Sequence, residues 1–261
     1  MTTSSIVSRC CMVLDLVTGA GPLDFTDIVR QAGLPKSSIH RLLAILTNEG
    51  LVEFDPSRQI YLPGRRLTGW AAGTFSGNRL PELSHDALRR LGENTGANVA
   101  LSVLRADAVL YMSTLQTGAP YRHAPGVGGQ SPLHASAAGK VFLAHLEQGR
   151  LKSILATLPL DRFNERTIVD TETLRLDLQQ VRANGYAACD REEFLQVAGL
   201  AAPVFDNTGQ VVAAVSLWNT VDHQSMSDLL EFAPTLKEQA RLISERLGWG
   251  AVPIRPSPAV S

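Results

Sequence analysis

The chain has no long hydrophobic run and no excess of charge of either sign. It contains no stretch of about eighteen apolar residues of the kind that crosses a membrane, and its N-terminus lacks a secretory pattern. We therefore expect a cytoplasmic protein with no membrane partner. Its 24 Lys and Arg stand against 25 Asp and Glu among 261 residues, a formal net charge of −1. That length suffices for two domains, each with its own core.

Cysteine is also scarce, with three residues in the whole chain. Cys10 and Cys11 are neighbours in an apolar segment with helical periodicity, which predicts buried thiols. Cys189 stands alone. The cysteine pattern therefore favours neither a disulfide nor a metal centre.

Two short helices around a glycine turn are predicted near the N-terminus. Asp24 to Ala32 predicts the first helix, with acidic residues in its first turn, where the helix dipole favours them. Gly33 ends this helix, and Pro35 opens the next at a position where its missing N–H costs nothing. The second helix has apolar residues at the spacing of one buried stripe: Ile39, Leu42, Leu43 and Leu46.

The opposite face of the second helix is polar near its N-terminus. It offers cations and short hydroxyls that suit phosphates and base edges in a major groove: Lys36, Ser37, Ser38, His40 and Arg41. Val52 to Leu62 then alternates around an Asp-Pro turn, which predicts a hairpin with Arg58 near its tip. Residues 1–64 are thus predicted to form a winged helix-turn-helix that binds double-stranded operator DNA. The alternative is a small helical packing motif with no nucleic acid partner.

The charge of this segment bears on how it binds. Met1 to Arg66 holds seven Lys and Arg and six Asp and Glu, so its net charge is +1. Affinity for DNA that is independent of sequence grows with the number of phosphates neutralised. A module this balanced is expected to depend on two copies that bind two half-sites, as a homodimer or homotetramer.

The rest of the chain has a different pattern. We expect a linker helix over 65–80, a domain over 81–250 and a disordered tail over 251–261. Polar turns and alternating apolar residues predict strands over 98–104, 109–115, 185–189, 197–205 and 211–217. Helices are expected over 81–95, 135–146, 147–156, 171–184 and 226–247. The fold class is therefore α+β, with a C-terminal sensory-type α/β domain (GAF/PAS-like) built on an antiparallel sheet.

The segment from Ser131 to Lys140 invites several chemical interpretations. A phosphate-binding P-loop fails, since Val141 stands where Ser or Thr is needed to bind magnesium. A catalytic pair of Ser136 and His134 lacks the strained strand-to-helix elbow of such enzymes. A metal site around His134 has no tight ligand spacing with other His, Asp or Glu residues. What remains is a helix start of small residues, whose backbone N–H groups stay open to an anion.

Several motifs in order resemble the isocitrate lyase regulator (IclR) family of bacterial transcription factors. They run over nearly the whole chain, from about Ser5 to Gly248. The matching runs are Gly33-Leu34-Pro35-Lys36-Ser37-Ser38 with His40-Arg41-Leu42-Leu43, Pro132-Leu133-His134-Ala135 with Gly139-Lys140, Gly185-Tyr186 with Asp190-Arg191-Glu192-Glu193, and Ala201-Ala202-Pro203-Val204 with Ala213-Ala214-Val215-Ser216.

The resemblance implies a homodimer or dimer of dimers in which a small organic acid, carboxylic or aromatic, binds the C-terminal domain and alters operator binding. By position it implies an effector pocket lined by Ala137, Ala138, Gly139, Cys189, Asp190, Gly199, Ser216 and Trp218. Open N–H groups near residues 137–139 would hold a carboxylate, Ser216 would donate a hydrogen bond, and Asp190 would accept one.

The chain departs from the family pattern in two places. The run from Glu193 to Gly199 is one residue short and has neither the Gly nor the Cys in its usual place, and Trp218 stands where a small residue is usual. An indole there either narrows the pocket or offers a stacking face, and the alternative is a core or dimer-contact tryptophan. For Asp190, the alternative is an ion pair with Arg191. For Ser216, the alternative is that it is only a small residue in a strand.

Three classes of function remain open. A ligand-responsive DNA-binding regulator without cofactor, metal or catalytic residue is the leading hypothesis. An enzyme with an appended DNA-binding domain would use Cys189 or His134, but no nucleophile is paired with a base at a recognisable spacing. A protein interaction module, in which the winged domain binds protein, is the third.

Overall fold

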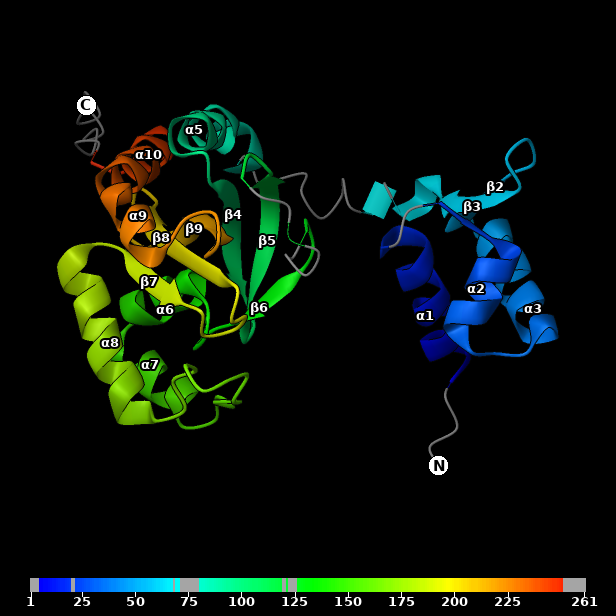
Figure 1. Cartoon of the computed structure of the whole chain (residues 1–261), viewed down its shortest axis with the longest axis horizontal. Coiled ribbons are helices and arrows are strands. Elements are labelled where there is room, and N and C mark those ends of the chain that lie inside the picture. The colour runs from blue at the N-terminus through cyan, green and yellow to red at the C-terminus, as the bar shows by residue number, and fades with distance from the viewer. Residues whose placement is uncertain are drawn as a thin grey trace, which may run out of the picture. The chain divides into compact units, whose positions relative to one another are not determined.

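The chain folds into two compact units, Met1–Arg79 and Leu80–Ser261. The computed structural model describes residues 5–19, 22–67, 69–70, 80–118, 121 and 126–250 (Figure 1). In the predicted linker, residues 65–67 and 69–70 are helical, and the stretch 71–79 lies outside the described residues. The predicted tail over 251–261 lies outside them as well. None of the described helices is both long and apolar enough to span a membrane.

The N-terminal unit combines helices with a small antiparallel sheet in the order β1-β3-β2. Its elements are α1 (Ile6–Gly19), β1 (Leu23–Asp24), α2 (Phe25–Ala32), α3 (Lys36–Asn48), β2 (Val52–Asp55) and β3 (Ile60–Pro63). Asp24 caps α2, accepting a 2.8 Å hydrogen bond from the backbone of Asp27, and Gly33 ends α2 in the left-handed conformation with φ 63°. The predicted helix, turn, helix and hairpin are therefore confirmed.

The core of this unit comes from α1, α2 and α3 together. Val13 and Val17 of α1 and Ile28 of α2 pack with the predicted stripe of α3, and all are buried. The prediction of two buried thiols on α1 is wrong for one of them: Cys10 is half-buried, but Cys11 is exposed. The two are adjacent on a helix, about 100° apart around its axis. When α1 turns Val13 and Val17 inward, Cys11 is left on the outer side.

The C-terminal unit is built on a six-stranded antiparallel sheet in the order β6-β5-β4-β9-β8-β7 (Figure 1). The strands are β4 (Asn98–Arg105), β5 (Ala108–Leu115), β6 (Gln130–Pro132), β7 (Ala187–Asp190), β8 (Val197–Phe205) and β9 (Val211–Thr220). The helices are α5 (Leu80–Thr95), α6 (Ala137–His145), α7 (Gln148–Leu155), α8 (Thr171–Asn184), α9 (Met226–Glu231) and α10 (Ala233–Arg246). The predicted α+β fold with an antiparallel sheet is confirmed.

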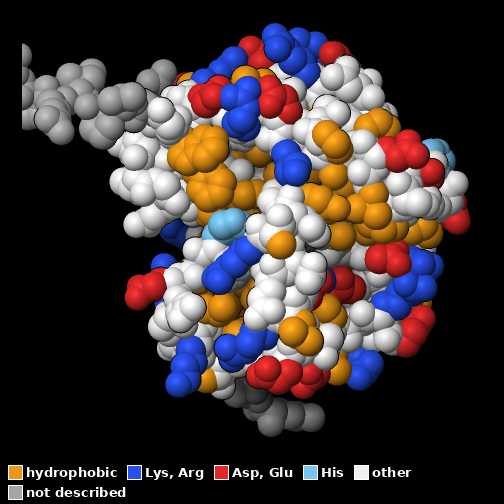
Figure 2. Space-filling model, turned by 90° about the vertical axis from the view of Figure 1, so that its left-hand side faces the viewer, with side chains coloured by type: hydrophobic (Ala, Val, Ile, Leu, Met, Phe, Trp, Pro, Cys, Tyr) orange, Lys and Arg blue, Asp and Glu red, His pale blue; other side chains and the backbone are white. Residues whose placement is uncertain are grey.

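Helices cover both faces of this sheet. α5 and α10 pack against each other and against β4, β8 and β9. On the other face, α6 and α8 pack over a core that includes Val141 of α6, Leu174 of α8 and Ala201 of β8. Figure 2 shows basic and acidic side chains interspersed over one face of the molecule, with apolar side chains between them. This surface agrees with the balanced net charge.

The boundaries of several predicted elements differ from the structure. The helix predicted over 226–247 is broken at Phe232, because Pro234 in the first turn of α10 lacks the N–H that a continuous helix would bond. α6 begins at Ala137 instead of residue 135, with Ser136 as its N-cap. β1 and β6, of two and three residues, were not predicted, since strands this short carry little periodicity. β9 extends to Thr220 and so includes Trp218.

Candidate functional site

The outer face of α3 presents the predicted DNA-binding side chains to solvent. Lys36, Ser37, His40 and Arg41 are exposed, and Ser38 is half-buried at the edge of the packed face. The first turn of α3 has no acidic residue, so nothing on the helix itself neutralises Lys36. The imidazole of His40 meets the ring of Phe25 edge-on with 6.3 Å between centroids. This contact ties the outer face of α3 to the start of α2.

The hairpin turn is held by one carboxylate. An oxygen of Asp55 accepts hydrogen bonds from the backbone and hydroxyl of Ser57, at 2.9 and 2.6 Å, and from the backbone of Arg58 at 3.2 Å. The hydroxyl bond, with the backbone bonds, lowers the pKa of Asp55 below its usual value. Gln59 completes the turn at φ 57°. The turn thus presents the exposed side chain of Arg58 on a defined backbone.

The C-terminal unit contains a cavity of about 70 Å³ at the start of α6. It is mainly apolar, with tyrosines, serines, a thiol and one carboxyl group as its polar side chains. The lining residues come from β5, β6, α6, β7, β8, β9 and the loops between them: Tyr111, Tyr121, Ser131, Ala135, Ser136, Ala137, Ala138, Cys189, Glu193, Phe194, Val197, Gly199, Leu200, Ser216, Leu217 and Trp218.

Most of the predicted effector-binding residues lie in this lining. Ala137, Ala138, Cys189, Gly199, Ser216 and Trp218 all contribute to it. Gly199 and Trp218 are paired across β8 and β9. A Cβ on Gly199 would come within 3.0 Å of the Trp218 Cβ and of the Leu217 carbonyl. A glycine on β8 therefore leaves room for the tryptophan on β9.

Gly139 lies outside the cavity lining, and the prediction that its N–H is open is wrong. This N–H donates to the hydroxyl of Ser136 at 3.2 Å, the N-cap bond of α6. A Cβ on Gly139 would lie 2.3 Å from the carbonyl oxygen of Leu133. Gly139 therefore permits close packing of α6 on the preceding loop, while Ala137 and Ala138 face the cavity.

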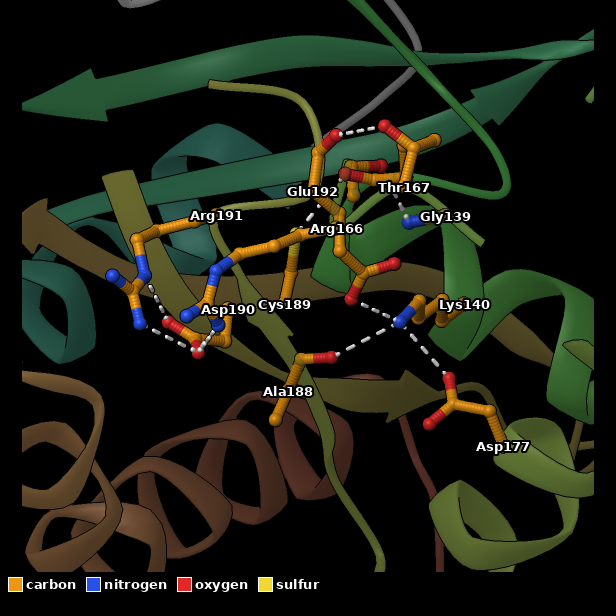
Figure 3. Close-up of polar contacts among 12 residues, drawn as sticks. Gly139, Lys140, Arg166, Thr167, Asp177, Ala188, Cys189, Asp190, Arg191 and Glu192 are labelled. Carbon is orange, nitrogen blue, oxygen red and sulfur yellow. Dashed lines mark hydrogen bonds and ion pairs between the residues drawn. The ribbon is translucent and has the colours of Figure 1, made fainter. Parts of the chain in front are cut away.

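Asp190 also lies outside the cavity lining. The prediction that it accepts a hydrogen bond from the effector is therefore wrong. Its carboxylate accepts hydrogen bonds from Arg166 at 2.7 Å and from Arg191 at 2.9 Å (Figure 3). The ion pair with Arg191, the alternative considered for Asp190, is confirmed. Two guanidinium groups already occupy the carboxylate, so it does not serve as an open acceptor in the cavity.

The sequence did not single out several of the polar lining residues. Tyr111 and Ser131 come from β5 and β6, where Val109 pairs with Ser131, and the Tyr111 hydroxyl reaches Ser131 at 3.3 Å. Glu193 stood inside a motif without an assigned role, and Tyr121 carried no local signal. Glu192 and Glu193 directly follow Arg191, whose backbone lies in the left-handed region at φ 64°, a conformation that the sequence did not predict.

Burial sets the protonation of the cavity groups. It raises the pKa of Glu193 to about 7, and a hydrogen bond with Ser131 opposes this effect. Burial likewise raises the pKa values of Tyr111 and Cys189 to about 12. The Cys189 thiol donates to the carbonyl of Ala135 at 3.0 Å. A nucleophilic cysteine needs a lowered pKa, so this thiol does not suit the enzymatic alternative.

Lys140, Glu192, Asp177 and Ala188 form a buried ionic cluster (Figure 3), and Ala188 and Glu192 directly adjoin the cavity-lining residues Cys189 and Glu193 in the chain. Lys140 of α6 is 1% exposed, and its ammonium contacts Glu192 at 2.5 Å and Asp177 of α8 at 3.0 Å. The ammonium also donates to the carbonyl of Ala188 at 3.4 Å. Burial acts to lower the pKa of Lys140, but the carboxylates outweigh it and the pKa lies above its usual value. Lys140 thus joins α6 to α8 and β7.

His134 is fixed away from the cavity lining. Its ring is 1% exposed, its Nε2 lies 3.0 Å from the carbonyl oxygen of Asp161, and it stacks on Phe163 with 5.8 Å between centroids. No hydrogen bond joins it to Ser136 in the described structure, since that hydroxyl donates to Pro132. Within the described ranges, no group of three His, Cys, Asp or Glu residues could hold a metal ion.

The sequence matches models of two domains of one protein family. The IclR helix-turn-helix domain matches residues 7–56, and the domain described as bacterial transcriptional regulator IclR C-terminal matches residues 73–245. The chain is 33% identical over 238 residues to the HTH-type transcriptional regulator BhcR of Paracoccus denitrificans, covering 91% of this chain and 85% of that protein. It is 30% identical over 239 residues to the transcriptional repressor IclR of Escherichia coli, covering 87% and 84%.

Solved structures agree with this fold. The crystal structure of Thermotoga maritima IclR superposes with a TM-score of 0.78 at 24% identity, covering 93% of this chain and 98% of that one. An IclR homologue from Microbacterium hydrocarbonoxydans, complexed with 4-hydroxybenzoate, superposes with a TM-score of 0.67 at 26% identity, covering 91% and 99%.

Proposed function

The chain belongs to the IclR family of bacterial transcriptional regulators, and we propose that it is a ligand-responsive one. In this proposal, α3 and the hairpin bind operator DNA as a homodimer or a dimer of dimers. A small organic acid, carboxylic or aromatic, occupies the cavity of the C-terminal unit and controls this binding. The cavity beside the start of α6 is the observation that carries the proposal.

The DNA contacts are proposed for the exposed face of α3 and for Arg58. The buried stripe of α3 fixes which side of the helix faces outward, so Lys36 and Arg41 present their charges together with Ser37, Ser38 and His40. Cations and hydroxyls contact phosphates and base edges in a major groove. Because the unit has almost no net positive charge, two copies on two half-sites are needed for useful affinity.

The effector contacts are proposed for the cavity lining. The N–H groups of Ala137 and Ala138 lie in the first turn of α6, where the helix dipole favours an anion. The Ser216 hydroxyl donates a long hydrogen bond of 3.5 Å to the carbonyl of Ala100, and a bond this long is weak enough for a ligand acceptor to replace it. The exposed part of Trp218 offers a stacking face. The 4-hydroxybenzoate bound by a relative is an acid of the proposed class.

Fluorescence anisotropy with labelled DNA from the promoters next to the gene tests the DNA-binding half. We expect Arg41→Ala to weaken binding and, if Arg41 neutralises a phosphate, to lower the slope of log affinity against log salt by about one. Arg105→Ala removes the same charge from an exposed position in the C-terminal unit and serves as the control. Absence of a sequence-specific shift on any of these promoters, with or without acids, would refute the proposal.

A thermal-shift screen of small organic acids tests the effector half. A ligand at a hundred times its dissociation constant stabilises the folded chain by about 2.7 kcal/mol. Arg41→Ala is expected to bind the same acid with unchanged affinity, because α3 and the cavity lie in different units. Loss of acid binding in this variant would contradict the division of roles.

A further inference from the structure

The cavity has an unexpected charge balance for a site that holds an acid. Among its described lining residues, Glu193 is the one carboxyl group, and none is Lys, Arg or His. A bound anion would therefore meet backbone N–H groups, hydroxyls and an indole, but no side-chain cation from the described lining. The position of Glu193 then determines which functional groups, besides one carboxylate, the ligand can have.

The nearby cation does not serve the cavity. The ammonium of Lys140 is held at 2.5 Å by Glu192, the residue just before Glu193, and at 3.0 Å by Asp177. Two carboxylates already surround this single positive charge, and it is buried among them. Glu192 and Glu193 thus have different surroundings: Glu192 is paired with the Lys140 ammonium, whereas Glu193 faces a cavity whose described lining contains no Lys, Arg or His.

The groups around Glu193 come from three strands, two adjacent at one edge of the sheet and one at the other edge. Ser131 of β6 forms a side-chain hydrogen bond with it, and Tyr111 of β5 bonds Ser131 in turn. Cys189 of β7 lies close enough for the charge of Glu193 to affect its pKa. The pKa values of Tyr111 and Cys189, at about 12, keep both groups neutral between pH 6 and 8. Glu193, at about 7, is the cavity group that titrates in that range.

We propose that Glu193 determines the specificity of the cavity: it selects acids with one carboxylate and a hydrogen-bond donor such as a hydroxyl, and it excludes acids with a second carboxylate. The inference rests on the proposed effector site. The ligand's carboxylate would lie at the first turn of α6, and its hydroxyl would donate to Glu193. A second carboxylate would meet the Glu193 carboxylate with no Lys, Arg or His among the described lining residues to separate them, which is unfavourable at low dielectric.

The proposal has a defined pH dependence. With a pKa of about 7, Glu193 is mostly ionised at pH 8, where it accepts from a hydroxyl and repels a second carboxylate. At pH 6 it is mostly protonated and able to donate to that carboxylate. Binding of a dicarboxylate is then linked to uptake of one proton, so its affinity falls by up to about tenfold per pH unit above 7. The preference for the hydroxy acid over the dicarboxylate should therefore increase from pH 6 to pH 8.

Matched ligand pairs provide the test. The probes are the three hydroxybenzoate isomers, each compared with the benzenedicarboxylate that has a carboxylate in place of the hydroxyl. Isothermal titration of the full chain, without DNA, gives both affinities at pH 6, 7 and 8. We expect at least one hydroxybenzoate to bind, with a preference over its partner of more than about tenfold at pH 8 and a smaller one at pH 6.

Glu193→Gln keeps the shape of the side chain but is neutral at every pH. We expect it to bind the dicarboxylate more tightly at pH 8 than the native chain does, and to lose the pH dependence of the preference. Glu172→Gln is the matched control, because the Glu172 side chain on α8 is 77% exposed. It should bind the dicarboxylate at pH 8 as weakly as the native chain and retain the pH dependence of the preference. Unchanged benzoate affinity in Glu193→Gln would show that the cavity is intact.

Three results would overturn the inference. They are equal or tighter binding of the dicarboxylates at pH 8, a pH-dependent preference that persists in Glu193→Gln, and no binding of any hydroxybenzoate at millimolar concentration. Because no DNA is present, these outcomes are independent of the promoter assay. Failure of promoter binding would refute the proposed function and leave the ligand preference measurable.

Discussion

Replacing Lys140 with methionine should destabilise the C-terminal unit strongly. The ammonium lies 2.5 Å from Glu192, which is 7% exposed. At an effective dielectric constant of about 20, the attraction at this distance is about 7 kcal/mol. The cost of removing each ion from water offsets several kcal/mol of it. Methionine keeps the apolar part of the side chain but leaves Glu192 buried without its cation, a change that costs about 3–5 kcal/mol.

Urea unfolding of the full chain, followed by tryptophan fluorescence, measures this cost. Trp218 and Trp249 report on the C-terminal unit, and Trp70 on the N-terminal unit. Lys152→Met is the control, since Lys152 is exposed on α7 and its removal should change the free energy of unfolding by less than about 0.5 kcal/mol. The double variant Lys140→Met/Glu192→Leu removes both charges and should recover most of the stability. A cost below about 1 kcal/mol for Lys140→Met, or a double variant no more stable than the single one, would refute the reasoning.

Three further predictions concern single residues. Gly139→Ala should lower the free energy of unfolding by about 1–3 kcal/mol, because its Cβ would lie 2.3 Å from the Leu133 carbonyl oxygen. On α7, the Cβ of Gly149→Ala meets no atom of the described residues within 4 Å, so this variant should be neutral or stabilising; urea midpoints compare the two. Asp24→Ala removes the N-cap of α2 and should cost about 1 kcal/mol of unfolding free energy in the N-terminal unit, with unchanged stability as the contradicting result. Cys11 is exposed and should react quickly with a thiol reagent, while the buried Cys189, with its pKa of about 12, should react only on unfolding; equal rates by mass spectrometry would contradict this.

Local patterns were sufficient to predict most of the fold. The stripe on α3, the turn residues of the hairpin and the alternation in β8 act over a few neighbouring residues, so a single sequence carries them. β6 was missed because three residues show no period, and Cys11 was misplaced because the packed side of α1 depends on tertiary contacts. Short-range periodicity therefore predicts elements better than it predicts which face of an element is buried.

Only some of the residues that line the cavity were predicted, because local motifs do not show which strands pair. Ala137, Ala138, Ser216 and Trp218 were predicted from motif positions. Tyr111 was not, because its place in the lining depends on the pairing of β5 with β6, a strand that the sequence did not predict. Asp190 and Glu193 are only three residues apart. In the structure, Asp190 pairs with arginines, whereas Glu193 lines the cavity. The spacing of charges in a turn does not show which element each side chain meets.

Lys140→Met also tests whether the cation serves the effector or the fold. If Lys140 were the counter-ion of the bound acid, its removal would weaken acid binding together with stability. In the structure, its charge is already held by Glu192 and Asp177, and Lys140 is absent from the cavity lining. A domain with about 5–15 kcal/mol of stability remains folded after a loss of about 3–5 kcal/mol. Hydroxybenzoate affinity measured by titration at 15 °C should therefore stay within about threefold of the native value, a change below about 1 kcal/mol. A decrease of more than about tenfold in the folded variant would place Lys140 in the acid site and contradict the assignment of selectivity to Glu193.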